Sequence, residues 1–176
     1  MKNLFAAVLL TVVAVSGCSA PPAATPAMLM PAHALVPELD GRGWKTGNAG
    51  RNQTEILLEW VLPGESVSDW TELLTWHTIL RPVDIGQLLA STQKSLEEGS
   101  TGFRTNVLAE SPTSIVFEWS HQGAGDWPAQ REVRRFVTGS DGLYTVAYSV
   151  KEASFSQERY DDWKTRILNA TLISTR

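Results

Sequence analysis

The residues able to carry out acid-base or metal chemistry are few and widely spaced in this chain. His77 and His121 lie on separate segments, and Glu118 and Asp126 are the carboxylates that could join them. Imidazole and carboxylate groups ligate zinc and also serve as general acids and bases. A hydrolase or metal-dependent enzyme that uses His77 or His121 is therefore an alternative interpretation, and it requires the fold to bring these groups together.

The usual sequence signatures of catalysis are missing. The chain has no Gly-x-Ser-x-Gly elbow, no glycine-rich phosphate loop and no pair of histidines at metal-ligand spacing. Asp161 and Asp162 are adjacent in a segment with helical spacing, so their side chains point in different directions. We therefore expect no catalytic residue, no metal site and no cofactor, and we interpret the chain as a non-enzymatic protein.

The segment "HQGAGDWPAQ", residues 121–130, is the best candidate for binding a partner. It is rich in glycine, carries Asp126, and displays Trp127 immediately before a proline. Long loops often carry function, and tryptophan is common where proteins bind one another. We expect His121, Asp126 and Trp127 to contact a protein, peptide or lipid partner. The alternative is that Trp127 folds back over the edge of a sheet.

Gly64 and Glu65 lie in the turn "PGES" between two apolar segments. A loop glutamate beside a glycine can accept backbone N–H bonds and thereby fix the turn. We interpret both residues as structural, with a ligand-binding role for Glu65 as the alternative.

The first seventeen residues have the organisation of a secretory signal peptide. One lysine precedes an apolar run of about a dozen residues, which is the length of a signal-peptide core and shorter than a membrane-spanning helix. The run ends in "VSGC", which resembles the lipobox of bacterial lipoproteins. The resemblance implies cleavage before Cys18, a diacylglycerol on its sulfur and an acyl chain such as palmitate on its nitrogen. The alternative is a buried free cysteine.

The residues after the cysteine set its location and its distance from the domain. By the same resemblance, Ser19, where an aspartate would favour the inner membrane, implies the periplasmic face of the outer membrane. Residues 18–37 are dominated by alanine and proline and contain no charged side chain, a composition typical of a semi-rigid tether. We interpret His33 within it as a solvated linker residue. Residues 38–176 then form a single domain.

The net charge of the chain argues against nucleic acid as a partner. The chain has 15 Lys and Arg against 19 Asp and Glu, a net charge of −4, with no basic stripe. A protein that neutralises phosphates needs such a stripe. We therefore expect no nucleic-acid partner.

The pattern of apolar residues predicts an α+β domain. Apolar and polar residues alternate in 54–62 and 70–80, as in half-buried strands, although 70–80 also fits a helix face. Helical spacing follows Asp84, a candidate N-cap, and ends near Gly99, a candidate C-cap. Four further strands in meander order are predicted, at 102–111, 114–122, 131–139 and 143–151. A last helix begins after Ser156, and we predict that both helices flank a mostly antiparallel sheet.

One stretch resembles a known fold family. Within residues 57–75, "LLEWVLPGESVSDWTELLT", an aromatic strand, a Gly-Glu turn and a Trp-Thr pair follow one another, formed by Trp60, Gly64, Glu65, Trp70 and Thr71. This stretch and the predicted element order resemble the PsbP-like fold, which is shared by photosystem-associated proteins, the Ran-binding Mog proteins and some bacterial lipoproteins. The resemblance implies an α/β/α sandwich and a role in binding or assembly.

Together these features predict a membrane-anchored envelope lipoprotein without catalytic activity. Its domain is expected to bind or assemble a partner at the membrane surface. The alternatives are the periplasm-facing hydrolase or metal-dependent enzyme described above, and a structural envelope component with no specific ligand.

Overall fold

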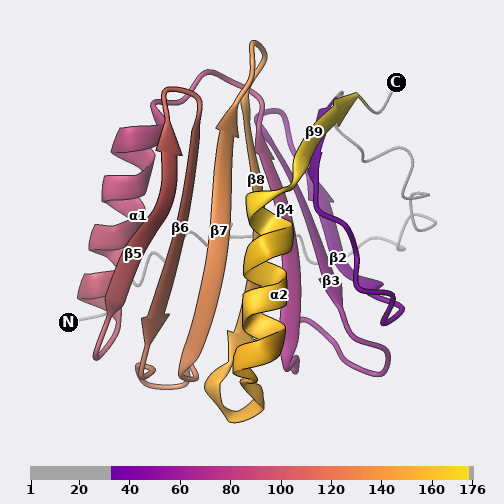
Figure 1. Ribbon diagram of the computed structural model, residues 1–176, viewed down its shortest axis with the longest axis vertical. Helices are drawn as coiled ribbons and strands as arrows, with labels where there is room; N and C mark the ends of the chain where they lie inside the picture. Colours follow the sequence, from indigo (N-terminus) through magenta and orange to yellow (C-terminus); the bar gives the residue numbers. More distant parts are fainter. Residues whose placement is uncertain (1–32, 175–176) are drawn as a thin grey trace, which may run out of the picture.

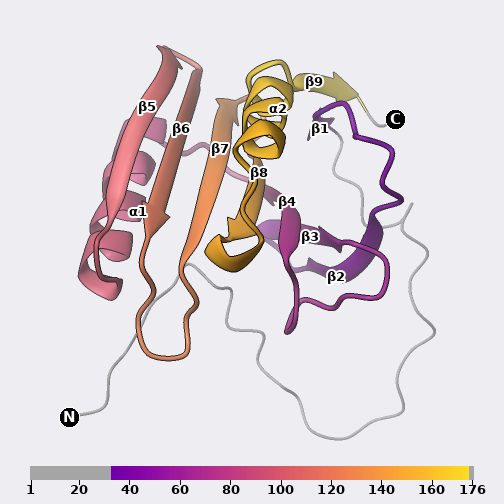
Figure 2. The same ribbon diagram turned by 60° about the horizontal axis from the view of Figure 1, so that its bottom comes forward.

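The computed structural model describes residues 33–174 (Figures 1 and 2). The predicted signal peptide, the predicted lipidation site at Cys18 and most of the predicted tether lie outside the described residues. In chain order the elements are β1 (His33–Val36), β2 (Lys45–Arg51), β3 (Glu55–Val61), β4 (Glu72–Ile79), α1 (Ile85–Gly99), β5 (Arg104–Ser111), β6 (Ser114–His121), β7 (Gln130–Thr138), β8 (Leu143–Lys151), the 3-10 turn η2 (Glu152–Ser154), α2 (Gln157–Leu168) and β9 (Thr171–Ser174).

One seven-stranded antiparallel sheet, in the order β2-β3-β4-β8-β7-β6-β5, organises the domain. Strands β5 to β8 form the predicted meander, and β8 returns beside β4, so that Glu72 pairs with Val150 and Ile79 with Leu143. Every residue of β8 except the last is buried, because this strand lies at the centre of the sheet. The predicted α+β class with a mostly antiparallel sheet and two helices is confirmed.

Residues 54–62 and 70–80, in which apolar and polar residues alternate, form the antiparallel pair of strands β3 and β4. The helical alternative for residues 70–80 is wrong. Leu58 pairs with Trp76 and Trp60 pairs with Leu74, so these apolar residues share one face of the sheet. His77 lies on the other face, as the alternation predicts.

Both predicted helices begin directly after the N-cap residues predicted for them. The Asp84 carboxylate accepts the Gln87 backbone N–H at 2.9 Å and starts α1. Gly99 was wrong as a C-cap: it is the last helical residue, and the cap is Ser100, whose hydroxyl donates to the Leu96 carbonyl at 2.6 Å. Ser156 caps α2.

The helices cover opposite faces of the sheet. Alternation along β8 sends Leu143 into a core with α1 and its neighbour Tyr144 into a core with α2. The aromatic side of α2 buries Tyr160 and Trp163 in the second core. Figure 1 shows α2 in front of β8 and next to β7, and Figure 2 shows α1 behind β5 and β6.

The domain begins earlier than the sequence predicts. Residues 33–36, assigned to the tether, form β1 and pair with β9, and Leu35 is only 2% exposed. His33 is correspondingly a residue of β1 rather than of the linker; its side chain remains 39% exposed, and its Nδ1 lies 3.4 Å both from Asp141 Oδ2 and from the Tyr144 hydroxyl. Strand β2, at the edge of the sheet, was also not predicted.

A buried ion-pair network fastens the segment between β1 and β2 to the rest of the domain. Glu72, 2% exposed, accepts two hydrogen bonds from Arg42, at 2.8 and 2.7 Å, one from Arg159 at 3.0 Å and one from the Tyr148 hydroxyl at 2.6 Å. Asp40 accepts from Arg42 Nε at 2.6 Å and from the indole N–H groups of two tryptophans. All four hydrogen bonds to the Glu72 carboxylate thus come from elements distant in sequence.

This network changes the acidity of its carboxyl groups. Burial alone would raise the pKa of Glu72, but the hydrogen bonds from Arg42 and Tyr148 outweigh it and the pKa falls below its ordinary value. The pKa of Asp40 is lowered in the same way: hydrogen bonds from Trp44 and Arg42 outweigh burial. Both groups are therefore carboxylates at neutral pH.

Candidate functional site

The β6–β7 loop, residues 122–129, has a defined turn at its tip. Ala124 and Trp127 exchange two backbone hydrogen bonds of 3.0 Å around Gly125 and Asp126. Gly125 has φ +58°, and no residue other than glycine among those described has positive φ. This combination is that of a type II′ turn, in which glycine occupies the first central position. The turn leaves Asp126 exposed at the tip.

Gly123 fixes the base of this loop. It has φ +94°, and a Cβ at this position would lie 2.7 Å from the Trp127 carbonyl oxygen. Its own carbonyl accepts hydrogen bonds from both the backbone N–H and the hydroxyl of Thr101, at 3.1 and 2.6 Å. The loop is thereby held against the segment that follows α1.

The loop brings together two of the three predicted partner-binding residues. The rings of Trp127 and His121 have centroids 4.0 Å apart, and His121 in turn stacks on Trp119 at 5.5 Å with an angle of 8°. His121 is 3% exposed, whereas Trp127 is only partly buried. Trp127 therefore packs one part of its surface on the sheet and leaves the rest accessible, whereas the exposed Asp126 is not part of this ring cluster.

His121 is held as a neutral imidazole. Its Nδ1 accepts the Gly123 backbone N–H at 2.8 Å, which assigns the ring proton to Nε2. Burial lowers the pKa of His121, which also favours the neutral form at pH 7. With no carboxylate bonded to it among the described residues, the ring has no partner for acid-base work.

A buried donor and a buried acceptor remain free beside this ring. His121 Nε2 and Gln130 Oε1 are both buried without a hydrogen-bond partner among the described residues. The two residues pair directly across β6 and β7, so the inner end of the loop offers one N–H and one C=O. Gln130 was not predicted from the sequence, because its position opposite His121 depends on the register of the hairpin.

The structure does not bring His77 and His121 together. His77 lies in the cross-strand row of Thr145, Phe136 and Ile115, so β8 and β7 separate it from β6. Ile115 and His121 are six residues apart on β6, which corresponds to a separation on the order of 20 Å along the strand. A single site cannot contain both histidines.

The histidines also lack the predicted carboxylate partners. Glu118 lies on the face of the sheet opposite to His121 and forms an ion pair of 2.9 Å with Lys164. His77 Nε2 is instead 3.4 Å from Glu55, and burial lowers the pKa of His77 although Glu55 opposes the shift. Within residues 33–174 no three His, Cys, Asp or Glu side chains are grouped to hold a metal ion.

Gly64 and Glu65 shape the β3–β4 loop. Gly64 has φ +89°, which favours glycine. The Glu65 carboxylate accepts the backbone N–H of Thr71 at 3.1 Å and its hydroxyl at 2.5 Å, closing the loop onto the start of β4. Both oxygens are engaged within the loop itself.

Neither helix between residues 33 and 174 has the length and apolar character needed to cross a bilayer. The chain matches no model of a known protein family and no curated protein.

Proposed function

We propose that this chain is a non-catalytic lipoprotein of the bacterial cell envelope that binds a partner through the β6–β7 loop. The sequence "VSGC" supports a lipid anchor at Cys18, and Ser19 supports the periplasmic face of the outer membrane. Two helices on opposite faces of one antiparallel sheet are consistent with a PsbP-like α/β/α sandwich. Fold alone does not define function.

The observation that carries the binding role is the β6–β7 loop itself. Two glycines with positive φ and the hydrogen bonds to Thr101 hold its backbone in one arrangement. On this rigid frame it displays Asp126, Pro128 and part of Trp127. A loop whose backbone is already fixed loses little conformational entropy on binding, so such a loop suits recognition of another molecule.

The position of the loop relative to the tether fits this role. His33, where the tether enters, lies beside Tyr144 at the start of β8, in the same row as Val137 and Ser114. The loop begins after His121, seven residues beyond Ser114, which is about 23 Å further along β6. Figure 1 shows these two ends of the sheet at opposite ends of the long axis. A domain tethered at one end would present the loop away from the membrane.

The anchor is tested by metabolic labelling with palmitate. The native chain is expected to carry the label and to fractionate with outer membranes, because several acyl chains hold a protein stably on a bilayer. Cys18→Ser is expected to abolish both properties. Label retained on the Cys18→Ser protein would refute the anchor.

The partner is tested by crosslinking the lipidated protein in isolated envelopes and recovering it with its neighbours. A stoichiometric partner is expected with the native chain and is expected to be lost in Asp126→Lys and Trp127→Ala. Asp69→Lys is the matched control, since Asp69 is also exposed but lies on the β3–β4 loop. Absence of any partner, or equal loss with Asp69→Lys, would contradict binding at the β6–β7 loop.

A further inference from the structure

Two aspartates in this chain, Asp40 and Asp141, are followed directly by glycine. An aspartate in this setting can react with the backbone of the next residue, because glycine has no side chain to block the approach of its nitrogen to the aspartate carboxyl carbon. The rate depends on how easily the carboxyl carbon and this nitrogen can meet. The fold places the two aspartates in very different surroundings.

Asp40 is firmly held in the buried network. Its side chain is 11% exposed. Its oxygens accept four hydrogen bonds, from the backbone N–H and Nε of Arg42 and from the indole N–H groups of Trp44 and Trp163. The carboxyl carbon can approach the Gly41 nitrogen only after several of these bonds break. In the folded chain, Asp40 is therefore expected to resist the reaction.

Asp141 lies exposed in the turn that joins β7 to β8. The two-residue turn between Gly139 and Gly142 is closed by a backbone hydrogen bond of 2.8 Å from the Gly139 N–H to the Gly142 carbonyl. The Gly142 N–H has no acceptor among the described residues. The Asp141 side chain is 45% exposed, accepts a hydrogen bond of 2.6 Å from the Tyr144 hydroxyl and lies 3.4 Å from His33 Nδ1. Few bonds have to break before the carboxyl carbon and the Gly142 nitrogen can meet.

We propose that Asp141 is a site of spontaneous isomerisation to isoaspartate in the folded protein. The Gly142 backbone nitrogen attacks the Asp141 carboxyl carbon, a C–N bond forms, and the carboxyl hydroxyl leaves as water with the proton of that nitrogen. A second water then opens the five-membered imide ring. Opening at the side-chain carbonyl restores aspartate, whereas opening at the backbone carbonyl leaves the main chain running through Cβ. Water is the only co-reactant, and this inference depends on neither the lipid anchor nor the β6–β7 loop.

The Tyr144 hydroxyl slows this reaction. The oxygen that leaves must carry a proton, but the hydrogen bond from Tyr144 favours the carboxylate and is the main reason that the pKa of Asp141 lies below its ordinary value. The same hydrogen bond ties the carboxyl group to β8. Removal of the hydroxyl is therefore expected to accelerate isomerisation.

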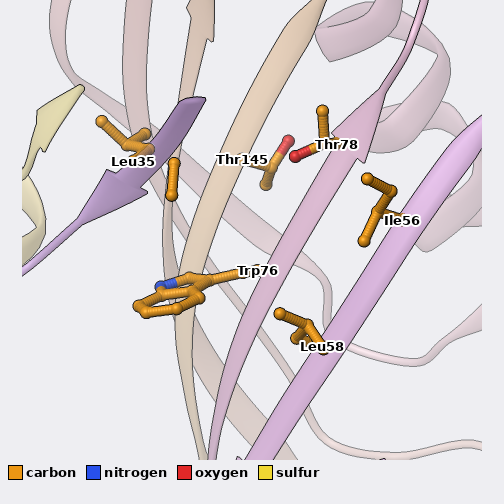
Figure 3. Close-up of a pocket in the computed structure, with 7 residues that line it drawn as sticks. Leu35, Ile56, Leu58, Trp76, Thr78 and Thr145 are labelled. Carbon is orange, nitrogen blue, oxygen red and sulfur yellow. The ribbon is translucent and has the colours of Figure 1, made fainter. Parts of the chain in front are cut away.

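Isomerisation at Asp141 is expected to loosen β1. The carboxyl group of the product is attached directly to Cα, one methylene closer to the backbone, so its contacts with Tyr144 and His33 are lost. Strand β1 covers a cavity of about 10 Å³, enough for about one water molecule, which is lined by Leu35 of β1 and Trp76 of β4 among others (Figure 3). The Trp76 indole N–H is buried and makes no hydrogen bond within the described residues. Its exchange with solvent therefore reports how firmly β1 is held.

The test is an ageing experiment on the purified full chain at mildly acidic pH. Samples of the folded chain and of the chain unfolded in urea are digested at intervals. Peptides that contain Asp40 or Asp141 are separated and identified by mass spectrometry with electron-transfer fragmentation, which distinguishes isoaspartate from aspartate. In the folded chain, isoaspartate is expected to form at Asp141 at least about tenfold faster than at Asp40, a difference of about 1.4 kcal/mol in the barrier. In urea the two rates are expected to be similar, since glycine follows both residues.

Three variants isolate the mechanism. Asp141→Glu keeps the charge but cannot close a five-membered ring, and is expected to form no isomer at this position. Tyr144→Phe is expected to isomerise about fivefold faster, as loss of one hydrogen bond of about 1 kcal/mol implies. Tyr160→Phe is the matched control, because it removes another buried tyrosine hydroxyl from the same core and is expected to leave the rate unchanged. Thermal unfolding checks that each variant folds.

The effect on β1 is followed by hydrogen exchange of the indole N–H groups, observed by ¹H–¹⁵N NMR and assigned through Trp76→Phe. The Trp76 N–H is expected to exchange faster in the aged native chain than in the fresh chain. Aged Asp141→Glu is expected to exchange as its fresh sample does. Equal exchange in the fresh and aged native chains would refute the loosening of β1.

Three results would overturn the assignment of Asp141. The first is that the folded chain forms no isoaspartate at Asp141 in the time in which the unfolded chain does. The second is that Asp40 and Asp141 isomerise at equal rates in the folded chain. The third is that folded Tyr144→Phe isomerises no faster than Tyr160→Phe.

Discussion

Replacing Arg42 with alanine is expected to destabilise the domain strongly, because it breaks a buried ion pair from one side. The substitution removes both donors from Arg42 to Glu72, at 2.8 and 2.7 Å, and the donor to Asp40 at 2.6 Å. Glu72, 98% buried, keeps only Arg159 and Tyr148. Removing one partner of such a pair costs roughly 3–5 kcal/mol, a large share of the roughly 5–15 kcal/mol that stabilises a typical protein.

The assay is equilibrium unfolding in urea, followed by circular dichroism. With a slope of about 2 kcal/mol per molar urea, a loss of about 4 kcal/mol lowers the midpoint by about 2 M. The matched control is Arg131→Ala. Arg131 also holds a glutamate, Glu152, through contacts of 2.7 to 3.0 Å, but the two side chains are 38% and 40% exposed.

The control separates burial from the number of hydrogen bonds. Arg131→Ala is expected to cost about 1 kcal/mol, since exposed ion pairs contribute little and its contact with the Phe155 ring adds a modest amount. If Arg42→Ala lowers the midpoint no further than Arg131→Ala, with the slope unchanged in both, the reasoning is refuted.

Three further predictions follow from the same structure. The pKa of Glu72 is lowered in the folded state, so near this pKa the folded protein binds fewer protons than the unfolded one. The resulting stabilisation is fully present above pH 4.5, the ordinary pKa of a glutamate, and is lost as the pH falls below that value. Thermal unfolding between about pH 5 and about pH 3 should therefore decline less steeply for Arg42→Ala than for the native chain, and equal slopes would exclude this linkage. Gly142→Ala would drive a methyl group into the Ile79 carbonyl at the end of β4, and should lower the free energy of unfolding by about 1–3 kcal/mol in urea. Gly50→Ala is the control, because a Cβ there meets nothing within 4 Å, and its free energy of unfolding should stay at least about 1 kcal/mol above that of Gly142→Ala. Asp84→Ala removes the N-cap of α1 and should cost about 1 kcal/mol in the same assay, so an unchanged midpoint would show that the cap contributes nothing.

Local patterns in the sequence were sufficient for much of the fold. Alternation in residues 54–62 and 70–80 identified β3 and β4, because each strand has one face in the core and one face outside it. The N-caps Asp84 and Ser156 identified the starts of both helices, because capping requires only a few neighbouring residues.

Three strands could not be predicted because their stability comes from distant partners. Strands β1 and β9 have four residues each, and each is held by the other end of the domain. Strand β2, "KTGNAGR", has no apolar alternation, since it is an exposed edge strand fixed by pairing with β3. Propensity is weak in such segments, and tertiary pairing decides their conformation.

The candidate site was predicted in composition but not in geometry. Glycines and a tryptophan marked the β6–β7 loop, whereas the stacking of His121 and the free acceptor of Gln130 depend on strand register. The buried Arg42–Glu72 network could have been predicted from one feature of the sequence, because Glu72 occupies the same face of β4 as the apolar Leu74 and Trp76. An acidic residue at an apolar position of a strand indicates a buried cationic partner.

The Arg42–Glu72 network also determines how the domain would carry a mechanical load. In the proposed anchored state, a pull on the tether reaches β1 first, whose pairing with β9 spans only four residues. Next along the chain come Glu38, whose carbonyl accepts from Arg166, and then Asp40 and Arg42, which are fastened to β4 and α2. Peeling of β1 would therefore stop at this network, so the domain can yield at its tethered end by a few residues while the sheet and the β6–β7 loop keep their shape.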